Sequence, residues 1–143
     1  MKVIIMGCGR VGASVATRLD AEGHEVTVLD LDAAAFARLP STFGGERLVG
    51  SGFEHRRLEE AGIRDADAFL ALAHGDNRNI LASQLARHQY GVETVVTRLY
   101  DPFRAEIFGR LGLRTFSPTN IGAELAYGAL MGTEAADQAS VSS

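Results

Sequence analysis

The residues best suited to chemistry in this sequence are three glycines near its start. They lie in residues 7–12 (GCGRVG), which match the pattern GxGxxG and follow a short apolar run. Gly7 permits a tight turn, Gly9 lets the backbone approach a pyrophosphate without a Cβ in the way, and Gly12 lets a helix pack close to a sheet. The first turn of that helix offers free N–H groups and a partial positive charge to an anion. The spacing therefore predicts a binding loop for phosphate groups.

An acidic residue follows the loop at the distance that this motif requires. Asp30 comes 18 residues after Gly12, at the end of the second apolar run. Its carboxylate could accept hydrogen bonds from both ribose hydroxyls and would repel a 2′-phosphate, which favours NAD or an adenosine nucleotide over NADP. Asp32 could reach the same ribose or only cap the next helix, and the sequence leaves both open. The plainer alternative is a glycine turn beside an Asp that faces solvent.

Two side chains inside the loop have more than one interpretation. Arg10 is a cation in the first turn of a helix, where it opposes the helix dipole, so we expect an anion to compensate it. That anion could be a phosphate, bound directly or across a subunit interface; otherwise Arg10 is exposed without a partner. Cys8 is expected to be a small filler residue, although a helix N-terminus can lower the pKa of a thiol.

Polar residues also follow the fourth and fifth apolar runs. In a doubly wound sheet the ligand lies outside the carboxyl ends of the strands. Residues 71–77 (ALAHGDN) would pass beside it, which makes His74 a candidate contact and Asp76 a helix cap. Asn79 lies in the first turn of the helix that follows. Arg98 ends an otherwise apolar run and is expected either to contact a phosphate or to form a structural salt bridge.

These candidates require elements that bring them to one edge. Short runs rich in Val, Ile and Leu alternate with longer helical patterns, which predicts βαβ units. The runs VIIM, VTVL, AFLAL and TVVTR are apolar throughout, as in strands covered on both faces. We therefore predict an α/β fold: a Rossmann-like doubly wound parallel sheet of six strands, in the order 3-2-1-4-5-6, within three layers. The expected strands are 3–6, 26–29, 47–49, 68–72, 94–98 and 113–116, and the expected helices are 10–21, 33–39, 54–61, 77–90, 103–111 and 118–130.

The length of 143 residues fits one domain, which we place at residues 1–131. Residues 132–143 are expected to form a disordered tail, because they contain almost no large apolar side chain. The last helix carries Ile121, Leu125 and Ala129 at spacings of four. This stripe could face the core or a second subunit, and we expect the subunit contact.

Composition excludes several classes of function. A net charge of −4 argues against a nucleic-acid partner, and a single cysteine excludes a disulfide framework and a multi-cysteine zinc site. No histidine has metal-ligand spacing, and no residue is placed to transfer a proton to a cofactor. We expect nucleotide binding without catalysis and without a metal. No apolar run approaches the roughly 20 residues that cross a bilayer, and no signal peptide is visible, so we expect a cytoplasmic protein.

Five segments in this order carry a family resemblance: GCGRVG, VTVLDLD, LEEAGIRDADAFLAL with a following Gly-Asp-x-x-Asn, VVTRLYDP and LGLRTFSPTNIGAELA. Over residues 1–130 the chain resembles the RCK/KTN (TrkA-N) family. These are nucleotide-sensing domains of bacterial potassium uptake and channel proteins of the Trk, Ktr and Kch kind.

The resemblance implies a regulatory domain that binds NAD(H) or an adenine nucleotide (ATP, ADP or AMP). It implies a homo-oligomer, a dimer or a ring, that docks on a membrane potassium transporter at the inner face of the membrane and controls transport by changing conformation. By position, the cofactor-binding residues would be Gly7, Cys8, Gly9, Arg10, Val11, Gly12, Asp30, Leu31, Asp32, Gly50, Ser51, Gly52, Ala73, His74, Asn79 and Arg98.

Two features depart from the family pattern. Ser51 stands where the family usually has Asp, which removes an acceptor near the base. The family's C-terminal effector domain does not follow, so we expect an N-terminal fragment or a stand-alone sensor. The alternative from a different class of function is the cofactor-binding fragment of an NAD-dependent oxidoreductase.

Overall fold

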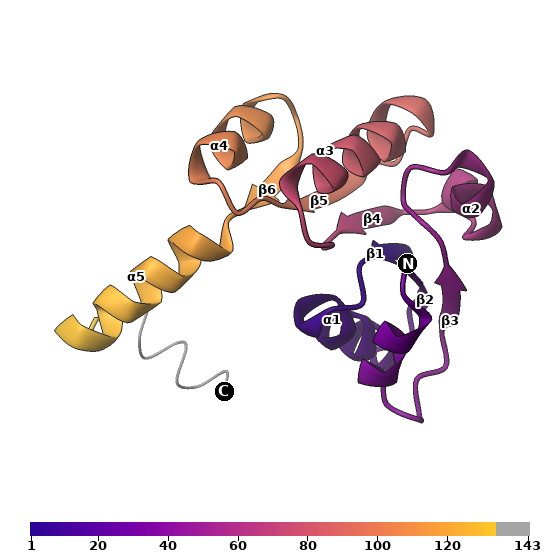
Figure 1. Ribbon diagram of the computed structural model, residues 1–143, viewed down its shortest axis with the longest axis horizontal. Coiled ribbons are helices and arrows are strands. Elements are labelled where there is room, and N and C mark those ends of the chain that lie inside the picture. The colour runs from indigo at the N-terminus through magenta and orange to yellow at the C-terminus, as the bar shows by residue number, and fades with distance from the viewer. Residues whose placement is uncertain (134–143) are drawn as a thin grey trace.

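The computed structural model describes residues 1–133, which form a sheet of six parallel strands (Figure 1). The strands lie in the order β3-β2-β1-β4-β5-β6, with β1 and β4 in the middle. The Rossmann-like doubly wound sheet with this strand order is confirmed. The strand bounds are Lys2–Met6 (β1), Glu25–Asp30 (β2), Glu46–Val49 (β3), Ala68–Ala71 (β4), Thr94–Arg98 (β5) and Arg114–Phe116 (β6).

The helices follow the strands in the predicted alternation. They are α1 (Arg10–Ala21), α2 (His55–Glu60), α3 (Asp76–Gln84), α4 (Pro102–Arg110) and α5 (Pro118–Met131), with short 3-10 helices η1 (Ala33–Arg38) and η2 (Ile63–Asp65). Two segments differ from the predicted α-helices. The segment after β2 is the 3-10 helix η1, capped by the side chain of Asp32. The last turn after α3 is the π-helix η3 (Leu85–Gln89), in which the N–H of Tyr90 donates to the carbonyl of Leu85.

An apolar layer covers each face of the sheet, and β1 explains why its sequence run is apolar throughout. Successive side chains of a strand point to opposite faces. Val3 and Ile5 pack with Ala16 of α1 in one cluster, whereas Ile4 and Met6 pack in the other with residues of α2 and α3. Figure 1 shows α1 and α3 on opposite sides of the sheet, as the predicted three layers require.

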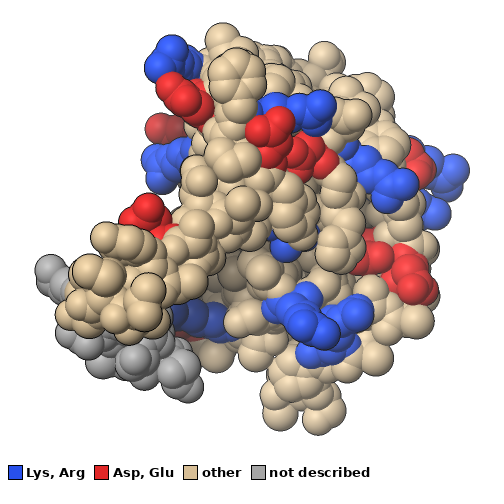
Figure 2. Space-filling view, turned by 60° about the vertical axis from the view of Figure 1, so that its left-hand side comes forward, with Lys and Arg blue, Asp and Glu red and all other residues tan. Residues whose placement is uncertain are grey.

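The final helix, α5, does not cover the sheet. It begins as predicted, with the Ser117 hydroxyl accepting from the N–H of Asn120 and a proline at the first helical position. Ile121 is 47% exposed and Leu130 is 83% exposed. Figure 1 shows α5 running away from the sheet, and Figure 2 shows this projecting end as a surface with few charges. The predicted apolar stripe therefore does not join the core of its own chain.

No helix in the described part of the chain combines the length and the apolar character that crossing a bilayer requires. The predicted tail lies outside the described residues from residue 134 onward.

Candidate functional site

The glycine loop between β1 and α1 is shaped by contacts that leave no room for two side chains. Gly7 has a φ of 106°, and a Cβ there would lie 2.7 Å from the nitrogen of Ala73. A Cβ on Gly12 would lie 1.8 Å from the carbonyl oxygen of Gly7. In contrast, the nearest atom to a Cβ on Gly9 would be His74 Nε2 at 3.9 Å. The tight turn predicted at Gly7 and the close packing predicted at Gly12 are confirmed, and the space in front of Gly9 is open.

The carboxylate of Asp30 braces this loop from the end of β2. Its Oδ2 accepts from the N–H of Cys8 at 2.8 Å, and its Oδ1 accepts from the N–H of Asp32 at 2.8 Å. A carboxylate has about four lone-pair positions, so Asp30 can still accept hydrogen bonds from a ligand hydroxyl. Asp32 accepts from the N–H of Ala34 at 3.0 Å, which confirms its predicted role as the cap of η1. Both carboxylates therefore lie at the same strand end.

The thiol of Cys8 faces the core instead of the solvent. Its side chain is fully buried and packs with Val28 and Ala13. Burial, and secondly the negative charge of Asp30, raise the pKa of this thiol. Cys8 is thus a filler residue, as predicted, and not an activated thiol. Its backbone N–H is already bonded to Asp30, so neither group faces a ligand.

Arg10 and Val11 are the first two residues of α1. Both are exposed. Arg10 lines a shallow outer groove between α1 and η1, together with Arg18 and Arg38. None of the ion pairs formed within residues 1–133 includes Arg10. The anion expected to compensate its charge is therefore not a carboxylate of the described chain.

Asn79 holds the loop after β4 from below. It is fully buried, and its Oδ1 accepts from the N–H of Ala73 at 3.0 Å. Its Nδ2 donates to the carbonyls of Ala73 at 2.8 Å and Arg98 at 2.9 Å. Sequence reasoning placed Asn79 among the ligand contacts, but the structure uses its whole amide to join the loop to β5.

Arg98, the last residue of β5, is a buried cation held by carbonyl groups. It is 5% exposed, and its Nη2 donates to the carbonyls of Leu72 and Ala73. Its guanidinium lies 5.3 Å from the ring centre of Tyr100, and its Nε has no hydrogen-bond partner in the described chain. No ion pair of residues 1–133 includes Arg98, so the structural salt bridge considered as an alternative is not formed there. Its positive charge lies just behind the loop after β4.

The turn after β3 brings Gly50, Ser51 and Gly52 to the same edge. The N–H of Gly50 donates to the carbonyl of Asp30 at 3.0 Å. A Cβ on Gly52 would lie 2.2 Å from the sulfur of Met6, which explains the glycine there by packing. Ser51 is buried, and its hydroxyl accepts from the N–H of Phe53 at 3.5 Å.

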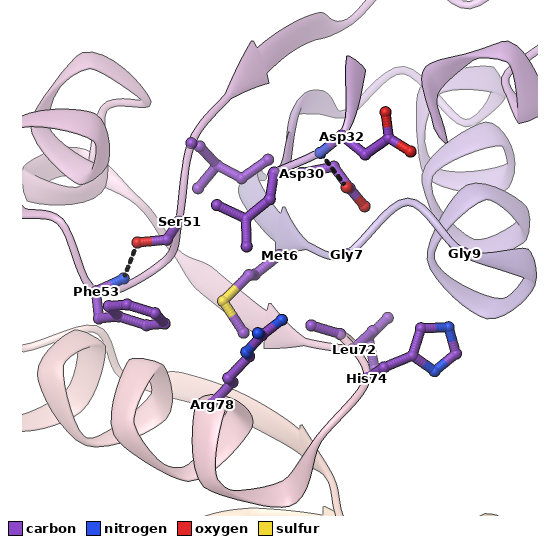
Figure 3. Close-up of a pocket in the computed structure, with 14 residues that line it drawn as sticks. Met6, Gly7, Gly9, Asp30, Asp32, Ser51, Phe53, Leu72, His74 and Arg78 are labelled. Atoms are coloured by element: carbon purple, nitrogen blue, oxygen red, sulfur yellow. Dashed lines mark hydrogen bonds between the residues drawn. The ribbon is translucent and has the colours of Figure 1, made fainter. Parts of the chain in front are cut away.

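A cleft of about 240 Å³ opens between these strand ends (Figure 3). It brings together nine of the predicted residues: Gly7, Gly9, Asp30, Leu31, Asp32, Gly50, Ser51, Ala73 and His74. Seven others do not line it: Cys8, Arg10, Val11, Gly12, Gly52, Asn79 and Arg98. Gly12, Gly52, Asn79 and Arg98 instead shape or support the loops that form its walls. Within residues 1–133 no group of three His, Cys, Asp or Glu side chains could hold a metal ion.

Sequence reasoning missed five residues of the cleft wall: Met6, Leu29, Phe53, Leu72 and Arg78. Four are apolar: Met6 and Leu29 belong to strands predicted to be covered on both faces, and Leu72 and Phe53 lie in segments predicted to pass the ligand without being named as contacts. Arg78 carried a signal that was available, because it is a cation in the first turn of a helix, as Arg10 is.

The family model for the TrkA-N domain matches residues 3–118. This match covers every strand and all the loops that surround the cleft. The chain belongs to the TrkA-N domain family. The predicted resemblance is therefore confirmed.

Two curated relatives of this TrkA-N domain come from different lineages. It is 52% identical over 115 residues to the Trk system potassium uptake protein TrkA of Streptomyces coelicolor, covering 80% of this chain and 52% of that protein. It is 37% identical over 108 residues to a TrkA homolog of Pyrococcus abyssi, covering 76% and 48% of the two chains. The chain thus spans about half the length of these relatives.

A solved structure with the same fold is the Kef C-terminal domain of Shewanella denitrificans in its AMP-bound form. It superposes with a TM-score of 0.73 at 25% identity, covering 94% of this chain and 84% of that one.

Proposed function

We propose that this TrkA-N domain is a nucleotide-sensing regulatory part of a Trk- or Ktr-type potassium uptake system. It binds NAD(H) or an adenine nucleotide (ATP, ADP or AMP) and catalyses no reaction. The observation that carries the proposal is the cleft in which the open space at Gly9 lies beside the carboxylates of Asp30 and Asp32. The names of the TrkA relatives and the AMP in the Kef structure support it.

The phosphates of the ligand would lie in front of Gly9. The N–H of Ala13 bonds to the carbonyl of Gly9 at 2.9 Å, so the first N–H groups of α1 precede the helical hydrogen bonds and are available to an anion. A buried cation is costly unless its charge is compensated, and Arg98 lies behind the neighbouring loop with no carboxylate partner in the described chain. Its field favours an anion at this edge.

The ribose would lie against Asp30 and Asp32. Asp30 is fixed in place by two backbone N–H groups, so its free lone pairs point in a defined direction before the ligand arrives. A carboxylate there repels a 2′-phosphate, which favours NAD over NADP. The base would then lie near Gly50, Ser51 and Gly52, where Ser51 replaces the family's usual Asp.

The projecting helix α5 supports the assembly part of the proposal. This apolar helix does not pack against the sheet of its own chain, and its side chains Ile121, Tyr127 and Leu130 are exposed. Such a surface is suited to burial against another subunit. We propose a homo-oligomer, in the cytoplasm at the inner face of the membrane, that contacts a potassium transporter. The ligand controls transport only through the difference in its affinity for two conformations of that assembly. The domain is residues 1–131.

Isothermal titration calorimetry of the chain with NAD⁺, NADH, NADP⁺, ATP, ADP and AMP tests the proposal. We expect saturable binding of NAD(H) or at least one adenine nucleotide, and binding of NADP⁺ about tenfold weaker than that of NAD⁺. A folded chain that binds none of them would overturn the proposal. Turnover of a nicotinamide substrate by the chain would instead support the oxidoreductase alternative.

A further inference from the structure

The start of α3 presents four polar residues in succession, and only one of them reaches the cleft. The carboxylate of Asp76 accepts from two backbone N–H groups after β5, at 2.8 and 3.2 Å. The amide of Asn77 accepts from an arginine of α4 at 3.1 Å, and Asn79 is buried beneath the loop. Within residues 1–133, the side chain of Arg78 forms no hydrogen bond and no ion pair. Its side chain is left available to a ligand.

Figure 3 shows where Arg78 points. Its side chain rises from α3 toward Met6, with Phe53 beside it on the α2 side of the cleft. Asp30 and Asp32 lie on the opposite wall. The guanidinium therefore lies among apolar lining residues beside Met6, across the cleft from the two carboxylates.

A guanidinium in this position is suited to a flat, uncharged ring. Arg is planar and stacks on aromatic faces, and protein sites for nucleotides use it in this way. A phosphate would instead be drawn to the open N–H groups at Gly9. The first turn of a helix also disfavours a cation, so an exposed and unpaired Arg78 gains little for stability from its position.

We infer that Arg78 is a base-binding residue of this site, which lays its guanidinium against the face of the purine while Asp30 holds the ribose. The inference rests on the proposed nucleotide-binding function and deepens it. Because the base is common to NAD, ADP, AMP and adenosine, Arg78 contributes the same factor to the affinity for each of them. Its contribution to the affinity does not depend on the number of phosphates in the ligand.

The test compares the variants R78M and R78K with the wild-type chain, using AMP and ADP in calorimetry and adenosine in NMR titrations. Met keeps the apolar stem, and Lys keeps the charge but lacks the planar group. We expect R78M to weaken binding of all three ligands by the same factor, roughly fivefold, and R78K to restore little of it. Arg56→Met, an exposed arginine of α2 outside the cleft, is the matched control and leaves every affinity unchanged.

The outcomes distinguish a failure of the proposed nucleotide binding from a failure of the base-binding role of Arg78. A wild-type chain that binds neither these three ligands nor NAD(H) or ATP overturns the proposed function, and the inference with it. If the wild type binds but R78M weakens only AMP and ADP, or R78K restores them fully, Arg78 contacts phosphate and the base-binding inference is wrong. Unchanged affinity for all three ligands in R78M, with an unchanged circular dichroism spectrum, also overturns the inference alone.

Discussion

The loop after β1 and the loop after β4 touch each other at Gly7 and Ala73, yet they are stabilised by opposite means. The first is shaped by missing side chains, since Gly7 and Gly12 have no space for a Cβ. The second is held by the buried polar side chains of Asn79 and Arg98, which bond to its backbone. One wall of the cleft therefore depends on the absence of side chains at two positions, and the other depends on the presence of two buried polar side chains.

The strongest test of this difference lies within the glycine loop itself. Gly12→Ala places a methyl group 1.8 Å from the carbonyl oxygen of Gly7, so the loop must move. We expect the free energy of unfolding to fall by about 3 kcal/mol or more, as for severe steric strain, with loss of nucleotide binding. Urea denaturation followed by circular dichroism measures the change.

Gly9→Ala is the matched control for that substitution. Its backbone is extended at φ −77°, and its new methyl group would meet no atom closer than 3.9 Å, so we expect stability within about 0.5 kcal/mol of the wild type. The methyl group occupies the space assigned to the phosphates, so binding should be lost without unfolding. Equal stability of the two variants would contradict the steric account.

The loop after β4 should be destabilised when its buried polar groups lose their hydrogen-bond partners. Asn79→Leu removes the partners of the N–H and carbonyl of Ala73 and of the carbonyl of Arg98. The carbonyl of Ala73 still accepts from Arg98 Nη2, so two groups are left unpaired. At the lower end of the roughly 1–3 kcal/mol that each such buried group costs, we expect a loss of roughly 2–3 kcal/mol in the free energy of unfolding. Asn77→Leu, on the exposed side of the same turn, should change stability by less than about 0.5 kcal/mol. Similar losses of stability in both variants would show that the buried hydrogen bonds of Asn79 do not stabilise this loop.

A smaller effect is expected where the first loop meets the ligand. Asp30→Asn keeps the size of the side chain but removes its charge, so we expect affinity for NAD⁺ to fall by about tenfold. The preference for NAD⁺ over NADP⁺ should narrow as well, because the repulsion of a 2′-phosphate is gone. Calorimetry with both cofactors measures this. Asp65→Asn, which changes an exposed carboxylate outside the cleft, is the control, and an unchanged preference in D30N would remove the ribose role from Asp30.

The smallest expected effect concerns the outer end of the glycine loop. Arg10 is exposed and lies outside the cleft, so Arg10→Ala should weaken ATP and ADP by roughly threefold through lost charge attraction, and leave adenosine unchanged. Raising the salt concentration should reduce the difference in ATP and ADP affinity between the variant and the wild type. An equal loss for all three ligands would exclude Arg10 from the phosphate end of the site.

The difference between the loop after β1 and the loop after β4 also explains which features could be predicted from the sequence. The glycine loop and the cap at Asp32 depend on nearby residues, and Asp30 follows the loop at the spacing of the motif, so the sequence placed all three at the same edge of the sheet. The strand order followed from the alternation of strands and helices together with the glycine motif after the first strand, which is typical of the Rossmann order. These features depend on local sequence and on general rules of chain topology.

The roles of Asn79 and Arg98 could not be predicted in this way. A polar residue at the end of a strand or the start of a helix can face either a ligand or the inside of a loop, and the choice depends on contacts with distant strands. Arg78 was missed for a related reason. Its direction depends on how α3 is rotated on the sheet, which buries Asn79 and turns its neighbour toward the cleft.

The middle position of β1 also affects how the chain folds while it is being synthesised. β1 precedes every other strand of this sheet, but one of its two partners is β4, where Val3 pairs with Ala68. Until β4 has left the ribosome, the backbone N–H and C=O groups along one edge of β1 have no strand to bond. At about 5–20 residues per second, that interval lasts several seconds, during which a nascent chain needs protection from aggregation.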